Sequence, residues 1–97
     1  MSYTLTETAK QDLEEILAYI AEDNLQAAYN WLDKLYENMD KLSLQPKMGH
    51  ARLDLTSHPV RFWPVGNYLI VYALDAKNYV TIVRVLNGYR DIVHLLT

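Results

Sequence analysis

The fold is decided by residues 60–86, VRFWPVGNYLIVYALDAKNYVTIVRVL. Three runs rich in β-branched and aromatic residues are separated by two turns, Gly66-Asn67 and 75–78, whose residues suit tight hairpin connections. The middle run is apolar on both faces, as expected of an interior strand. The pattern predicts successive strands over residues 60–65, 68–74 and 79–86.

Upstream of this meander, apolar residues recur at spacings of three and four in two runs, which indicates two amphipathic helices. Thr6 is a predicted N-cap for the first helix, because its hydroxyl can accept a hydrogen bond from an otherwise unpaired helix N–H. The pattern breaks at Asp23-Asn24, either of which can cap the second helix. So short a turn makes the two helices an antiparallel hairpin. Residues 2–5 are predicted to form a short strand before them.

The predicted order is therefore β-α-α-β-β-β in a single domain, residues 1–97, of the α+β class. We expect the helical hairpin to pack on one face of a small, largely antiparallel sheet and to leave the other face open. The composition, with 51% hydrophobic and 22% charged residues, is that of a globular protein. The absence of cysteine excludes disulfides and thiolate chemistry. We expect a cytoplasmic protein without membrane contact, since no signal peptide or spanning segment is visible.

The net charge of −3 conceals a polarity along the chain. Residues 1–45 carry a net charge of −6, and residues 46–97 carry +3 together with all three histidines. Asymmetry of this kind suggests a surface with its own electrostatic role. The connection over 45–59, long for a small domain and rich in turn formers and basic residues, is a candidate part of that surface.

Arg84 is the first candidate site residue. Simple alternation along the last strand places it on one face with Val80, Ile82 and Leu86. An unpaired arginine among apolar neighbours is costly, so two interpretations stand. Arg84 either forms a structural ion pair or binds an anion or a partner on the open face of the sheet.

Further candidates lie on the first strand of the meander and near the C-terminus. Arg61 and Trp63 share one side of their strand, either as a binding pair or as solvent-facing residues. Tyr89 and Arg90 follow the last strand, where functional residues are often located. His94 could serve as a general base. No histidine spacing or glycine loop typical of a metal or phosphate site is present, so we expect no metal and no cofactor.

Four segments resemble the RelE/ParE toxin superfamily, in order and over nearly the whole chain. They are DLEEILAYIAEDN (12–24), LSLQPKMGHARLDL (42–55), VRFWPVGNYLIVYAL (60–74) and VTIVRVLNGYRDI (80–92). Asn87 departs from the pattern, since many relatives carry histidine there. The resemblance implies the toxin of a bacterial type II toxin–antitoxin pair with a role in plasmid stabilisation. Its partner would be an antitoxin with a ribbon-helix-helix N-terminal domain and a flexible C-terminal segment, through which the toxin would meet DNA only indirectly.

The superfamily offers two activities, inhibition of DNA gyrase by binding and ribosome-dependent cleavage of mRNA. Cleavage needs an acid, a base and cations around the phosphate, for which the candidates are Arg61, Arg84, Tyr89 and His94. A chain of net charge −3 is poorly suited to RNA contact. We therefore expect a binding toxin of the ParE type rather than an enzyme. The alternatives are the nuclease and a degenerate member that binds only its antitoxin. The predicted target- and antitoxin-binding residues are Arg61, Trp63, Arg84, Tyr89 and Arg90, with an acidic amphipathic antitoxin helix on the sheet side neutralising the first and third of them.

Overall fold

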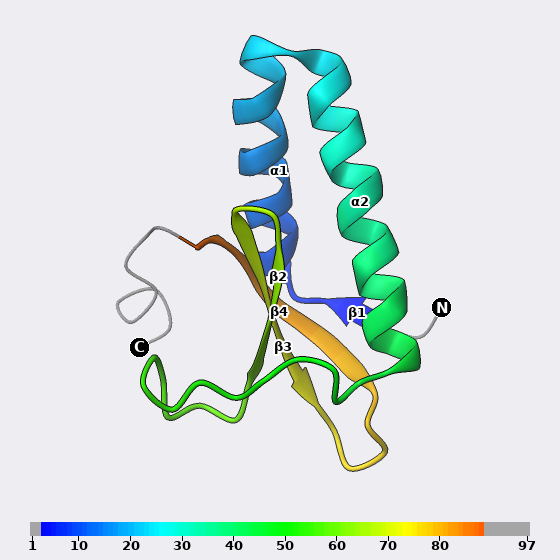
Figure 1. Ribbon diagram of the computed structural model, residues 1–97, viewed down its shortest axis with the longest axis vertical. Helices are drawn as coiled ribbons and strands as arrows, with labels where there is room; N and C mark the ends of the chain where they lie inside the picture. Colours follow the sequence, from blue (N-terminus) through cyan, green and yellow to red (C-terminus); the bar gives the residue numbers. More distant parts are fainter. Residues whose placement is uncertain (1–2, 89–97) are drawn as a thin grey trace.

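The computed structural model describes residues 3–88 and confirms the predicted order and the α+β class (Figure 1). A short strand and two helices precede three longer strands. The helices form an antiparallel hairpin over the sheet. The elements are β1 (Tyr3–Leu5), α1 (Glu7–Asp23), α2 (Leu25–Leu44), β2 (Arg61–Val65), β3 (Tyr68–Leu74) and β4 (Val80–Asn87).

The four strands form one mixed sheet in the order β1-β4-β3-β2. The three strands of the meander pair antiparallel through their hairpins. Gly66 takes a φ of +60° in the first of these turns, a conformation that glycine adopts without strain. The N-terminal strand β1 pairs parallel to β4 and matches Tyr3 with Val80. The sheet is thus largely antiparallel, with one parallel edge strand.

Both predicted helix caps are present. The Thr6 hydroxyl accepts from the backbone N–H of Ala9 at 3.0 Å, and the Asn24 side chain accepts from Ala27 N at the same distance. The apolar stripes of the helices face the sheet and form the main core with it. That core includes Leu35, Met39 and Leu42 of α2, which are fully buried. Figure 1 shows the far ends of both helices extending past the sheet.

The second face of the sheet is not left open, contrary to the prediction. Phe62, Val71 and Leu86 point there and are at most 4% exposed. Leu55, from the long connection before β2, packs against them. The prediction failed because the connection lacks helical or strand periodicity, which gave no indication that one of its leucines would join a second apolar cluster.

A β-bulge in β4 overturns the predicted face of its residues. Val71 of β3 lies opposite Arg84 while Tyr72 lies opposite Ile82, so Val83 has no counterpart. One extra residue shifts the alternation by one position. Val80, Ile82 and Val85 therefore belong to the core beneath the helices, whereas Leu86 belongs to the second cluster.

The connection between α2 and β2 is fixed to the sheet by Tyr72. This tyrosine is fully buried; its hydroxyl donates to the carbonyl oxygen of Pro46 at 2.7 Å and accepts from Gly49 N at 2.8 Å. A Cβ on Gly49 would lie 2.6 Å from that hydroxyl, which only glycine avoids. His50 continues the attachment with an isolated bridge to Phe62. The connection is therefore positioned by the sheet.

Candidate functional site

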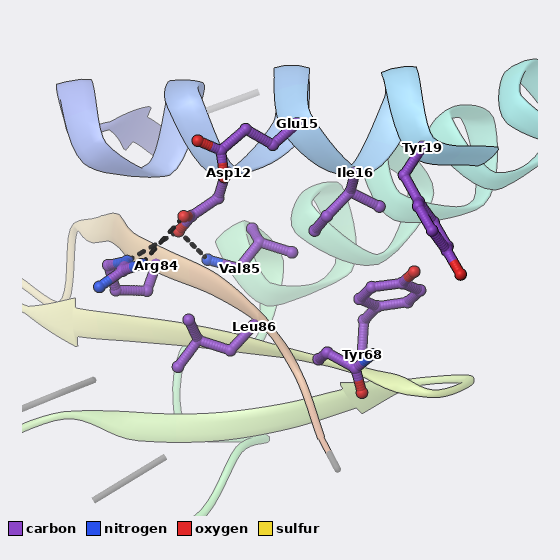
Figure 2. A pocket seen from close by; sticks show the side chains of 9 residues that line it. Asp12, Glu15, Ile16, Tyr19, Tyr68, Arg84, Val85 and Leu86 are labelled. Atoms are coloured by element: carbon purple, nitrogen blue, oxygen red, sulfur yellow. Dashed lines mark hydrogen bonds and ion pairs between the residues drawn. The ribbon is translucent and has the colours of Figure 1, made fainter. Parts of the chain in front are cut away.

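A groove of about 460 Å³ lies between α1 and the second half of β4. Figure 2 shows polar side chains at one end of it and two tyrosines pointing toward each other at the other end. Its lining comes from the first helix, the end of the last strand and the start of β3. The lining residues are Asp12, Glu15, Ile16, Tyr19, Tyr68, Arg84, Val85, Leu86 and Asn87.

The polar end of the groove is built on Asp12 of α1. Its carboxylate accepts from Nε and Nη2 of Arg84 at 2.8 and 3.0 Å, and from the backbone N–H of Val85 at 3.0 Å. The two side chains are 10% and 21% exposed, so most of this ion pair is removed from water. The hydrogen bond from the guanidinium to Asp12 is the main cause that raises the pKa of Arg84. The arginine is therefore held against α1.

Of the two interpretations of Arg84, the structure shows the ion pair, which Arg84 forms with Asp12. The guanidinium reaches Asp12 of α1, although the bulge at Val83 places Arg84 opposite Val71, a residue of the second cluster. The same segment is attached to the start of α1, since the Thr6 hydroxyl donates to Val83 O at 2.8 Å. Thr6 and Asp12 together anchor the bulge to the helix.

The aromatic end of the groove is formed by Tyr19 of α1 and Tyr68 of β3 (Figure 2). Tyr19 is 69% exposed, whereas Tyr68 is half-buried and its pKa is raised mainly by that burial. Behind Tyr68 stands Trp31 of α2, with ring centroids 5.3 Å apart and planes inclined by 60°. This tilted arrangement is a favourable aromatic contact. Trp31 therefore supports the Tyr68 wall of the groove, whereas Tyr19 on the opposite wall is open to solvent.

Arg61 and Trp63 share one side of β2, as predicted, but they lie away from the groove. Arg61 Nη1 donates to the carbonyl oxygens of Gly49 at 2.6 Å and Lys47 at 3.3 Å. Trp63 packs against the main core and donates Nε1–H to Asn38 Oδ1 at 3.0 Å. Both side chains thus make contacts that hold α2 and the following connection to β2.

The predicted site residues are not gathered in one place. β3 separates the strands of Arg61 and Arg84, an offset of roughly 10 Å between the β2 and β4 axes. Their side chains reach different neighbours, the 47–49 connection in one case and α1 in the other. Tyr89, Arg90 and His94 lie outside the described residues.

Sequence reasoning missed Asp12, Tyr19 and Tyr68 as parts of a site. A signal for Asp12 was available, because it occupies the apolar stripe of α1 beside Ala9, Leu13 and Ile16. An acid in such a stripe calls for a buried cationic partner. The two tyrosines carry no comparable signal, since their approach depends on how α1 crosses the sheet.

Residues 3–88 contain no cluster of histidine and carboxylate side chains that could hold a metal ion. Within the same range, neither helix combines the length and the apolar character that crossing a membrane requires.

Comparison with known proteins agrees with this architecture. Among solved structures, the chain is similar to one described as "Chromosomal ParDE TA system from P. aeruginosa", with a TM-score of 0.72 and 19% sequence identity over 90% of this chain and 95% of that chain. At this identity the likeness establishes the fold. A comparison with curated protein sequences finds no match. The family model described as "ParE toxin of type II toxin-antitoxin system, parDE" matches residues 3–92. Because that match covers nearly the whole chain, the protein belongs to the ParE toxin family.

Proposed function

We propose that this chain is the toxin of a type II toxin–antitoxin pair, that it acts by binding rather than by catalysis, and that its target is DNA gyrase. The observation that carries the proposal is that the candidate arginines Arg61 and Arg84 already have hydrogen-bond acceptors within the molecule. Arg84 is held by Asp12 with two hydrogen bonds, and Arg61 by two backbone carbonyls. Arginines committed in this way stabilise the fold and are poorly placed to gather around one phosphate.

The runner-up function is ribosome-dependent mRNA cleavage. Attack by a ribose 2′-hydroxyl needs a base, an acid and cations converging on one phosphate. In residues 3–88, Arg61 and Arg84 lie on strands separated by β3 and point to different neighbours. The net charge of −3 is also unfavourable for contact with ribosomal RNA. A nuclease would therefore have to rely on Tyr89, Arg90 and His94.

The partner we propose is a cognate antitoxin, supported by the family and by a structural relative described as a ParDE toxin–antitoxin system. It would carry a ribbon-helix-helix N-terminal domain and a flexible C-terminal segment that covers the toxin. Contact with DNA would then be indirect, through the antitoxin. Both the antitoxin and gyrase would be met in the cytoplasm.

Two assays on the same purified chain test the target. In a gyrase assay, we expect excess protein to inhibit supercoiling or to accumulate cleavage complexes. In a translation extract, we expect mRNA to remain intact. Codon-positioned cuts with unaffected gyrase would establish the nuclease instead. Growth arrest on expression without antitoxin separates both activities from a degenerate, antitoxin-binding member.

A further inference from the structure

Acidic groups outnumber basic groups around the groove between α1 and β4, and this excess indicates the charge of its partner. Arg84 is neutralised by Asp12. Glu15 lies close enough to contribute to the raised pKa of Arg84, yet within residues 3–88 it forms no hydrogen bond or ion pair. Apart from Asp12 and Glu15, α1 adds four further acids against one lysine. The described lining of the groove, which contains Asp12, Glu15 and Arg84, therefore carries a net negative charge beside its aromatic end.

The other half of the groove is suited to a large apolar side chain. Ile16 lies between the polar end and the two tyrosines, and Tyr19 stands over the opening with most of its surface exposed (Figure 2). Exposed tyrosines beside a half-buried partner are typical of protein-binding surfaces, because the ring contributes contact area and the hydroxyl stays solvated. Tyr68 cannot easily move away, since Trp31 supports it.

We propose that this groove is the docking site for a segment of the antitoxin in which a large apolar residue lies next to a lysine or arginine. The apolar side chain enters between Ile16, Tyr19 and Tyr68, and the cation pairs with Glu15. This inference rests on the proposed function, since it names a contact of the same toxin–antitoxin pair. It replaces the expectation of an acidic helix that neutralises Arg61 and Arg84, because both arginines already have acceptors inside the molecule.

The complementarity has a kinetic consequence. Six acids on one helix create a field that steers a basic segment toward the groove before contact is made. Association should therefore slow as salt rises, because exposed charges are screened beyond ~10 Å at 0.1 M salt. An acidic segment would show the opposite trend.

The test uses the full chain and the protein encoded by the reading frame adjacent to its gene. Glu15→Lys and Tyr19→Ala are each expected to weaken binding at least about tenfold in calorimetry. The matched controls are Glu14→Lys, an exposed neighbouring acid outside the groove, and Tyr29→Ala, an exposed tyrosine on α2. Tyr29→Ala should bind like the wild type, and Glu14→Lys should lose only the small part that comes from long-range steering. Thermal melts by circular dichroism establish that all four variants are folded.

A charge exchange locates the contact. Replacing the responsible basic residue of the antitoxin with glutamate should weaken binding to the wild type and restore binding to Glu15→Lys. If the antitoxin binds and all four variants behave alike, the groove proposal is overturned while the proposed function stands. If the adjacent protein does not bind the wild type at all, the proposed function fails and the groove loses its occupant with it. If the groove variants still bind the antitoxin but lose self-association or gyrase binding, the groove contacts a second copy or gyrase instead. That result would overturn the proposal.

Discussion

At the scale of single residues, Asp12 organises the contact between α1 and β4. One carboxylate accepts three hydrogen bonds from two consecutive residues that follow a bulge. Removing a partner from such a pair leaves a charge in a partly desolvated site, which is more destabilising than never having had the pair. Asp12 therefore contributes mainly by preventing this penalty and by setting where β4 bends.

Asp12→Asn should lower the free energy of unfolding by about 2–3 kcal/mol, because it removes the charge opposite Arg84 while keeping the side-chain shape. Urea denaturation measures this loss. The control is Glu7→Gln in the exposed Glu7–Lys10 pair at 3.4 Å, for which we expect about 0–0.5 kcal/mol. A double variant, Asp12→Leu with Arg84→Met, should regain part of the loss. Equal effects of the two single variants would contradict the assignment.

Gly49→Ala should destabilise the protein by about 2–3 kcal/mol, since a Cβ there would meet Tyr72 and the Phe62 carbonyl at less than 3.0 Å. Gly66→Ala is the comparison, because nothing lies within 4 Å of its Cβ position and only its positive φ opposes the change. We expect about 1 kcal/mol there. Thermal unfolding of both variants decides the order, and a larger effect at Gly66 would refute the steric argument.

The buried hydroxyl of Tyr72 should make the folded protein less stable at alkaline pH. Burial is the main cause that raises its pKa above the ordinary value of 10.0. The folded state therefore holds this proton more tightly than the unfolded state, and stability must fall as the pH rises above about 10. Tyr72→Phe should be less stable at pH 7 but should show a shallower decline above about pH 10. Urea denaturation measures the stability at each pH. Parallel declines in the wild type and in Tyr72→Phe would show that Tyr72 is not responsible.

At the scale of elements, the strands and helices were predictable because each follows a local pattern. The helical periodicity, the caps at Thr6 and Asn24, and the Gly66-Asn67 turn all have direct chemical causes in the sequence. The bulge at Val83 was not predictable, because it depends on how β4 meets α1 and β3 together. The groove was not predictable for the same reason, since Tyr19 and Tyr68 become neighbours only through tertiary packing.

Thr6 joins two elements, and its removal should show this. Thr6→Ala loses both the cap on α1 and the hydrogen bond to Val83 O, whereas Asn24→Ala loses only the cap on α2. We expect losses of about 2 kcal/mol and about 1 kcal/mol respectively. Thr6→Ser, which keeps the hydroxyl, should recover most of the stability. Chemical denaturation with equal effects at the two caps would exclude a special role for Thr6.

At the scale of the whole molecule, the helical hairpin divides into a part that covers the sheet and a part that extends past it (Figure 1). The covering part contains the fully buried residues Leu35, Met39 and Leu42. The residues around the turn between the helices include the exposed side chains Leu25 and Tyr29. A toxin built in this way offers its partner a projecting acidic helix beside a fixed sheet.

Hydrogen exchange should reveal this division. Amides over 17–31 are expected to be protected less than those of β3 by on the order of tenfold or more, because few buried contacts oppose local opening there. Mass spectrometry on the isolated chain measures the difference. Antitoxin binding in the groove should raise protection around Tyr19 selectively. Uniform protection along both helices would contradict the division.

The parallel pairing of β1 with β4 has a consequence for synthesis. Asp12 and Arg84 lie 72 residues apart along the chain, and Tyr3 pairs with Val80. At ~5–20 residues per second, roughly 4–14 s separate the translation of the two sides of this contact. A nascent chain that stops before Arg84 lacks the partner of Asp12 and the β4 wall of the groove. Products terminated before this point therefore cannot form the groove.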